Sequence, residues 1–181
     1  MNSLELFKDQ ATRRVILRPI SKEDVDVVFA FNSSSESLTY IAREPFKTIK
    51  EAQDKLDFFL AGNANKTSFW WVFVCKETGE KIGYGGLFDI SEKDKRAEIG
   101  YGLIKQYWNK GYMSEILKEI IKFAFTNLEL HKIYGVVIKG NIVSQGLLKK
   151  NGFVREAYLK DHSFARGRYF DEMVYGLLNE T

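Results

Sequence analysis

The sequence is poor in cysteine, proline and histidine, and it contains no long apolar run. The single cysteine, Cys75, excludes an internal disulfide framework, and the two prolines, Pro19 and Pro45, fall near the ends of predicted elements. His131 and His162 are too isolated to predict a metal site. No stretch approaches the ~20 apolar residues that cross a bilayer, and the first ten residues lack the apolar region of a signal peptide. We therefore expect a cytoplasmic protein without membrane partners.

The net charge is small, and the charged residues are evenly spread along the chain. The 27 Lys and Arg residues against 24 Asp and Glu residues give a net charge of +3, and no basic block occurs, so nucleic acid is not an expected partner. The chain has 181 residues, of which 45% are hydrophobic, and this is enough for a sizeable core. Because there is no linker, repeat or low-complexity stretch, we expect residues 1–181 to form a single domain.

Hydrophobic patterns predict an α+β fold. We expect strands at residues 13–20, 68–75, 81–88, 97–104, 132–138, 153–159 and 171–178. We expect helices after Ser21, from Thr48 to a stop at Gly62, from about 113 to 128, and from 144 to 152. This order predicts a mixed, mostly antiparallel central sheet of about seven strands with helices on both faces.

The stretch "QYWNKGYMSE", residues 106–115, directly precedes the most strongly amphipathic helix. It can be an ordinary turn between a strand and a helix. Alternatively, backbone N–H groups from about Asn109 to Ser114 converge on a pyrophosphate, helped by the positive end of the helix dipole. Lys110 would then add a mobile cation.

The element order, with "RAEIGYGLIKQYWNKGYMSEILKEI" and "GNIVSQGLLKKNGFVREAYLKD", resembles the GNAT family of acetyl-CoA-dependent N-acetyltransferases. The similarity is greatest to the ribosomal-protein N-terminal acetyltransferase branch and covers nearly the whole chain. The family signature consists of Gln or Arg, two residues, Gly, one residue, and then Gly or Ala. In this sequence its three defined positions are Gln106, Asn109 and Gly111. Asn109 departs from the usual Gly, and Asn is the non-glycine residue that best tolerates the left-handed region. The resemblance implies a GNAT-like fold and acetyl-CoA as cosubstrate.

The resemblance also implies where acetyl-CoA binds. The residues are Ile99, Gly100, Tyr101, Leu103, Gln106, Asn109, Lys110, Gly111, Tyr112, Met113, Ser114 and Asn141. Amides between Ile99 and Leu103 would bind the acyl oxygen or the pantetheine arm if a bulge frees them. Plain sheet packing explains Gly100 and Gly102 equally, and helix capping explains Asn141.

Acetyl transfer requires a base for the amine, donors for the oxyanion and a proton donor for the departing thiolate. Glu98 is the candidate base, and a solvent-facing carboxylate is the alternative. Many members of the family place a tyrosine acid four residues beyond the position of Ser144, but that residue is Leu148 in this sequence. The resemblance to the ribosomal-protein branch implies that the hydroxyl of Ser144 serves the leaving sulfur.

Other conspicuous residues carry weaker predictions. Cys75 lies in an apolar strand without an adjacent His, which is typical of a buried structural thiol. Trp70 and Trp71 face opposite sides of one strand, so at least one belongs to the core. Residues 31–46, which include Arg43, lie where the family shapes its acceptor groove, although a solvated loop is the alternative. Tyr169 and Asp171, in the closing hairpin, either line that groove or pin the turn.

We therefore expect an acyltransferase that moves acetyl from acetyl-CoA to a primary amine, foremost a protein N-terminus. One alternative acceptor is a small amine, such as a polyamine, an amino sugar or an aminoglycoside. Another alternative is a catalytically silent domain that senses CoA, which the departures at Asn109 and Leu148 keep open. An edge strand with aromatic residues either supports a homodimer or is covered by the closing hairpin.

Overall fold

The architecture comes from a computed structural model that describes residues 7–180. The first six of the ten N-terminal residues that were compared with a signal peptide therefore lie outside the described residues. In the first half of the chain, strands β1 (Gln10–Ala11) and β2 (Val15–Pro19) lead to a short 3-10 turn, η1 (Lys22–Asp24). Helices α2 (Val25–Ser33) and α3 (Ile49–Asn65) and strands β3 (Phe69–Cys75), β4 (Lys81–Ser91) and β5 (Arg96–Leu103) follow.

The second half begins with a 3-10 turn, η2 (Lys105–Tyr107), directly before helix α4 (Tyr112–Thr126). Strand β6 (Lys132–Ile138), helix α5 (Ile142–Lys150) and the long hairpin of β7 (Val154–Ala165) and β8 (Arg168–Leu178) complete the chain. No helix in the described part of the chain is long and apolar enough to cross a bilayer.

The described strands form one eight-stranded sheet in the order β1-β2-β3-β4-β5-β6-β8-β7. Neighbours are antiparallel except β5 and β6, which run parallel because α4 connects them as a crossover. The prediction of a mixed, mostly antiparallel sheet is therefore confirmed, and the strand beyond the expected number is the two-residue β1. The hairpin does not hide the sheet's end, since β7 is itself an edge strand and exposes Tyr158 and Phe164.

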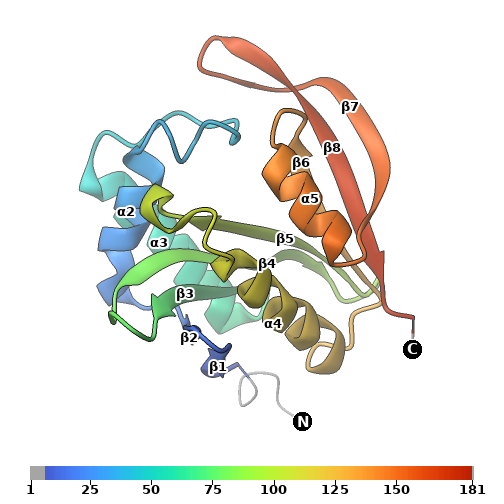
Figure 1. The fold of residues 1–181 in the computed structure, drawn as a ribbon, viewed down its shortest axis with the longest axis horizontal. Coiled ribbons are helices and arrows are strands. Elements are labelled where there is room, and N and C mark those ends of the chain that lie inside the picture. The colour runs from blue at the N-terminus through green and yellow to red at the C-terminus, as the bar shows by residue number, and fades with distance from the viewer. Residues whose placement is uncertain (1–6, 181) are drawn as a thin grey trace.

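Helices cover both faces of the sheet, as the sequence predicted (Figure 1). On one face, α4 packs against a core that includes Trp71, while α2 and α3 on the other face pack against a core that includes Trp70. Both tryptophans are buried because β3 lies between the two cores and sends alternate side chains to each. Cys75 is buried in the first of these cores, as expected.

The predicted helix stop at Gly62 is wrong. The capping box of Thr48 and Glu51 starts α3 as expected, but the helix continues to Asn65 and ends at Lys66, which adopts the left-handed conformation with φ 60°. A side chain at position 62 would meet Ser68 Oγ at 2.1 Å, so Gly62 is needed for the close approach of the following chain. A glycine near a helix end can thus serve packing instead of termination.

Candidate active site

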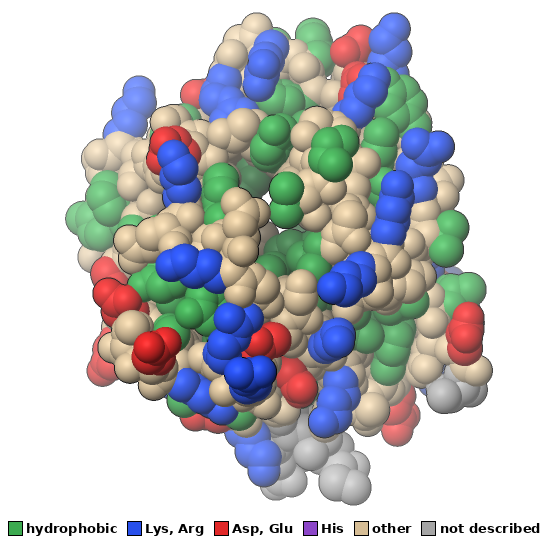
Figure 2. Space-filling model, viewed as in Figure 1, with side chains coloured by type: hydrophobic (Ala, Val, Ile, Leu, Met, Phe, Trp, Pro, Cys, Tyr) green, Lys and Arg blue, Asp and Glu red, His purple; other side chains and the backbone are tan. Residues whose placement is uncertain are grey.

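The site lies where two parallel strands separate. Pairing between β5 and β6 ends at Glu98 and Tyr134, and beyond this point the strands diverge around a cavity of about 670 Å³. Residues 98–103 of β5 line one wall of the cavity, and residues 135–137 of β6 line the other. In the space-filling view, the cleft is a hollow near the middle of the face, with hydrophobic side chains around it and Lys and Arg side chains nearby (Figure 2).

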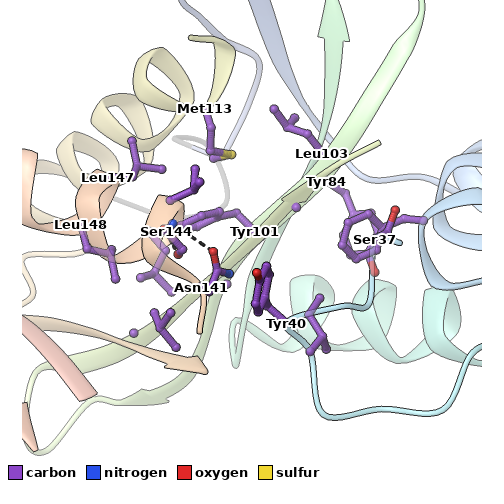
Figure 3. Close-up of a pocket in the computed structure, with 18 of the residues that line it drawn as sticks. Ser37, Tyr40, Tyr84, Tyr101, Leu103, Met113, Asn141, Ser144, Leu147 and Leu148 are labelled. Atoms are coloured by element: carbon purple, nitrogen blue, oxygen red, sulfur yellow. Dashed lines mark hydrogen bonds between the residues drawn. The ribbon is translucent and has the colours of Figure 1, made fainter. Parts of the chain in front are cut away.

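Strand β5 divides the cavity into two halves, because its side chains alternate between the faces of the sheet. Tyr101 belongs to the face of α4 and α5, whereas added side chains at Gly100 and Gly102 would meet the rings of Phe88 and Phe31 on the other face. Figure 3 shows Tyr101 and Ser144 on one side of the strand and Tyr84 on the other.

The two glycines of β5 are therefore explained in the first place by packing. A Cβ on Gly102 would lie 2.3 Å from Phe31, and one on Gly100 would lie 2.9 Å from Phe88. The register between β4 and β5 is continuous from Gly83 and Leu103 to Phe88 and Glu98, so the bulge expected in this segment does not occur there. The divergence of β6 opens this side of β5 instead, and the irregularity in the β4–β5 pairing lies beyond Phe88.

The loop before α4 has the backbone that its sequence indicated. Asn109 and Gly111 both have positive φ, 58° and 79°, so the left-handed conformation at the non-glycine position is confirmed. Gly111 is the N-cap of α4 and supplies no side-chain cap, which leaves the first-turn N–H groups of Tyr112, Met113 and Ser114 facing a helix end without a capping side chain. These donors and the helix dipole form a site that suits a phosphate.

Ten of the twelve predicted cofactor residues lie in the cavity lining. They are Ile99, Gly100, Tyr101, Leu103, Asn109, Gly111, Tyr112, Met113, Ser114 and Asn141. Gln106 and Lys110 lie outside it, and both are exposed. The ammonium of Lys110 lies 5.5 Å from the ring centre of Tyr107, so the charge of this residue is directed along the surface of the loop.

Helix α5 brings a serine to the cofactor half of the cavity. Asn141 caps the helix by accepting a hydrogen bond from the N–H of Ser144 at 3.1 Å, so the capping alternative for Asn141 is confirmed. The hydroxyl oxygen of Ser144 lies 3.1 Å from that of Tyr101 (Figure 3). Leu148 is buried one turn further along, where the family's tyrosine would be.

Tyr101 is the residue whose side-chain role the sequence did not indicate. It was predicted only as part of the backbone that contacts acetyl-CoA, yet its phenol reaches Ser144, 43 residues away in sequence. Burial raises the pKa of Tyr101 to about 12, so the hydroxyl stays protonated and can donate a hydrogen bond at neutral pH. Strand β5 thus places a phenol beside Ser144, whereas α5 carries Leu148.

Glu98 lies at the point where the strands separate and is half-buried. Burial, together with the carboxylates of Asp89 and Glu172, raises the pKa of its carboxyl to about 7, and the hydroxyl of Tyr134 opposes the shift. The single proton of that hydroxyl is donated to Asp89 Oδ2 at 2.5 Å. A carboxyl that titrates near pH 7 is suited to accept a proton from an amine.

The loop between α2 and α3 lines the other half of the cavity with Ser37, Tyr40, Ile41 and Arg43. Its position is fixed by the closing hairpin, where Arg166 donates to the carbonyl oxygens of Leu38 at 2.5 Å and Thr39 at 3.3 Å. Tyr40 also reaches the turn between β6 and α5, since a Cβ on Gly140 would lie 3.1 Å from its ring. The loop and the cofactor half therefore meet across the cleft.

The two hairpin residues singled out by sequence have different surroundings. Tyr169 is 63% exposed and packs edge-on against Phe164, outside the cavity lining. Asp171 accepts hydrogen bonds from the Tyr158 hydroxyl and from the Asp161 N–H, so it pins the two strands of the hairpin together.

The family model for the acetyltransferase (GNAT) domain matches residues 14–154. The chain belongs to the GNAT acetyltransferase family. Acetyl-CoA is accordingly its acyl donor, and it is an acyltransferase. The uncapped N-terminus of α4 and the adjoining cavity fit such a donor, because the diphosphate needs N–H groups and the pantetheine arm needs an open strand edge.

Relatives of different acceptor specificity share the fold. The chain is 32% identical over 173 residues to the uncharacterized N-acetyltransferase YoaA of Bacillus subtilis, covering 96% of this chain and 98% of that protein. It is 29% identical over 155 residues to spermidine N(1)-acetyltransferase of Escherichia coli, covering 86% and 81%. The solved RimL, a ribosomal L7/L12 alpha-N-protein acetyltransferase in complex with CoA, superposes with a TM-score of 0.84 at 17% identity, covering 93% and 96%.

Proposed function

We propose that this protein acetylates a primary amine, foremost the α-amine of a protein N-terminus, and that residues 1–181 form the single domain that does so. One observation carries the proposal: a continuous cavity joins the N-terminus of α4 to the groove formed by the α2–α3 loop. Glu98 and the Tyr101–Ser144 pair lie between these two ends, on opposite faces of β5.

In this mechanism Glu98 prepares the acceptor. Its carboxylate accepts a proton from the ammonium group, so that the neutral amine can attack the thioester carbonyl. The C–N bond forms first and gives a tetrahedral intermediate, the C–S bond then breaks and its electron pair leaves with sulfur, and the second proton of the nitrogen passes to solvent. Backbone N–H groups of β5 that face the gap toward β6 are placed to bind the developing oxyanion.

The Tyr101–Ser144 pair acts on the departing sulfur. A thiol has a pKa of about 8.5, well below the value of about 12 for Tyr101, so full proton transfer from the phenol to the thiolate is uphill. A hydrogen bond from the hydroxyl to the thiolate requires no proton transfer. The pair therefore stabilises the thiolate as a donor network, in which Tyr101 orients the hydroxyl of Ser144 toward sulfur.

A protein N-terminus is the acceptor that we favour, because the α2–α3 loop leaves an open groove beside Glu98, which an extended peptide end can enter. A polyamine is the second candidate, and the 29% identical spermidine acetyltransferase supports it. Two points weigh against the silent-sensor alternative: Asn109 has a positive φ, and in the mechanism we propose the hydroxyl of Tyr101 serves where Leu148 cannot.

The test is release of free CoA thiol from acetyl-CoA in the presence of short peptides, spermidine and amino sugars, with mass spectrometry to locate the acetyl group. We expect acetylation of peptide α-amines, and each peptide with a blocked N-terminus serves as the matched control. Turnover restricted to spermidine or amino sugars would replace the protein acceptor by a small amine. Binding of acetyl-CoA without turnover on any amine would overturn the enzymatic mechanism.

A further inference from the structure

The acceptor half of the cavity is basic. Among the described residues, the charged side chains that line the cavity are Glu98, Arg43, Lys55 and Lys150. Lys150 ends α5, on the cofactor side, whereas Arg43 and Lys55 belong to the α2–α3 side. An incoming acceptor thus meets two cations and, at the point where the strands separate, the proposed base.

Arg43 is held in place by neutral groups. Its Nη1 donates to Asn32 Oδ1 at 2.5 Å, and Asn32 in turn donates to the hydroxyl of Tyr84 at 2.7 Å. Asn32 is fully buried, so this contact fixes the guanidinium without neutralising it. In the part of the chain that the structure describes, Arg43 forms no ion pair, and its other side-chain partner, the Tyr84 hydroxyl, is neutral, so its positive charge is not balanced by a carboxylate.

Lys55 projects from α3 into the same space. Its ammonium lies 4.9 Å from the ring centre of Phe59, which stacks on Trp70. Burial, together with the charge of Arg43, lowers the pKa of Lys55 to about 8. Lys55 likewise has no carboxylate partner within residues 7–180. Two half-buried like charges are costly unless an anion joins them.

We propose that the acceptor carries an anionic group, in the simplest case a carboxylate, which Arg43 and Lys55 bind while its amine lies at Glu98. This inference rests on the proposed function and names the chemical class of its acceptor. A bidentate contact to Arg43 with a second contact to Lys55 satisfies both cations and orients the amine. A polyamine brings further positive charges to this end, and they would be repelled.

The carboxylate has two possible sources, which the test separates: an acidic side chain close to a peptide N-terminus, or the carboxylate of a small amino acid. Acceptors are compared in pairs that differ by one charge, peptides with Asp or Asn at the second position and free glycine or glycinamide, with spermidine as the polycation. We expect kcat/KM at least tenfold higher for the acidic member of the preferred pair. Equal rates within both pairs, or a preference for spermidine, would overturn the proposal.

Variants assign the preference to the two cations. Arg43→Gln and Lys55→Gln are each expected to reduce the acidic preference to about threefold or less through KM, and Lys55→Glu to reverse it toward neutral acceptors. Lys47→Gln, on the exposed part of the same loop, is the matched control and should keep the full preference. A preference that survives all three substitutions would show that other groups bind the anion.

A binding measurement keeps this inference separate from the proposed function. Calorimetric titration with N-acetylglycine and N-acetylglycinamide, in the presence of CoA, requires no turnover. Tighter binding of the acid, lost in Lys55→Gln, would support the anion site even if no amine were acetylated. Equal binding of the two compounds alongside normal turnover would reject the anion site and leave the acetyltransferase intact.

Discussion

Glu98, the proposed base, shows how the position of a carboxyl can change its pKa. Half-burial at the point where β5 and β6 separate, with Asp89 and Glu172 nearby, raises its pKa to about 7. The same environment that raises the pKa of the carboxyl also means that the charged carboxylate destabilises the folded state. Activity and stability therefore depend on this residue in opposite directions.

The activity prediction concerns pH. The proposed mechanism requires the deprotonated carboxylate of Glu98, so kcat/KM for the acceptor should rise with pH and show an inflection near pH 7. Glu98→Gln should lower kcat about a hundredfold or more and remove that inflection. An unchanged profile in the variant, measured by thiol release from pH 5.5 to 9, would assign the proton to water or to another group.

The stability prediction has the opposite sign. Because the folded-state pKa of Glu98 lies above the unfolded value of about 4.3, this residue lowers stability progressively as the pH rises from about 4.5 through 7. Glu98→Gln should therefore stabilise the fold at pH 8 relative to pH 5, on the order of 1 kcal/mol after allowance for its partial exposure. Denaturant unfolding at both pH values measures this, and Glu92→Gln, exposed on the β4–β5 turn, should show no such difference.

The hydroxyl pair gives a test of coupling. Tyr101→Phe and Ser144→Ala should each lower kcat about tenfold with little change in the KM for acetyl-CoA, and the double variant should lose less than the product of the two. In the proposed mechanism the two hydroxyls, which are hydrogen-bonded to each other, act on the same sulfur, so their effects should not be independent. Tyr169→Phe, outside the cavity, is the control. Additive losses would mean that the hydroxyls act separately.

At the scale of elements, the segment before α4 determines whether the helix can receive a phosphate. Asn109 and Gly111 bend the chain so that α4 begins at Tyr112 with its first N–H groups free of a side-chain cap. The side chain of residue 109 matters little for this role, since the requirement is on its backbone angles. Replacements can therefore be ranked by their tolerance of positive φ.

Asn109→Gly should preserve acetyl-CoA affinity, whereas Asn109→Val should weaken it about tenfold and cost roughly 1–2 kcal/mol of stability. A β-branched side chain is strained at a φ of 58°, and relief of the strain would misalign the N–H groups. Calorimetric titration with acetyl-CoA compares the two. Equal affinity of both variants would show that the loop conformation is not required for binding.

Elements also separate what the sequence predicts from what it does not. The strongly periodic α4 and the left-handed conformation of Asn109 were predictable because both depend on residues within a few positions of one another. The contact of Tyr101 with Ser144 was not, since it depends on how α5 docks against β5. Nor was the opening of β5, which results from the divergence of a neighbouring strand and not from the expected bulge.

Local signals misled where packing competed with them. Gly62 has the sequence context of a helix stop, yet α3 continues to Asn65. Ser68 occupies the space that a side chain at position 62 would need. The sequence did not predict that Arg43 and Lys55 act together, because one lies in a loop and the other on a helix. They form a pair only because both line the same cavity.

At the scale of the whole molecule, the last two strands support a loop formed near the start of the chain. The turn of the β7–β8 hairpin, residues 165–168, carries Arg166 to the carbonyl oxygens of the α2–α3 loop. Figure 1 shows the hairpin reaching across toward that loop. The acceptor half of the cavity therefore depends on segments more than 120 residues apart.

Arg166→Ala should loosen this loop without affecting the cofactor half. We expect the KM for the acceptor to rise about fivefold, the KM for acetyl-CoA to stay within twofold, and stability to fall on the order of 1 kcal/mol. Steady-state kinetics with each substrate varied in turn measures the two KM values. Arg155→Ala, exposed on β7, provides the control, and equal KM values in both variants would show that other contacts hold the loop.

The continuity of the cavity through the gap between β5 and β6 also leads to a prediction about the kinetic order of the reaction. Donor and acceptor can occupy the two halves at the same time, and Cys75, the chain's one thiol, is buried outside the lining, so no protein sulfur is placed to carry the acetyl group between them. We therefore expect both substrates to be bound before either product forms. Double-reciprocal plots at several fixed concentrations of the second substrate should give intersecting lines, and the parallel lines of a ping-pong reaction should not appear.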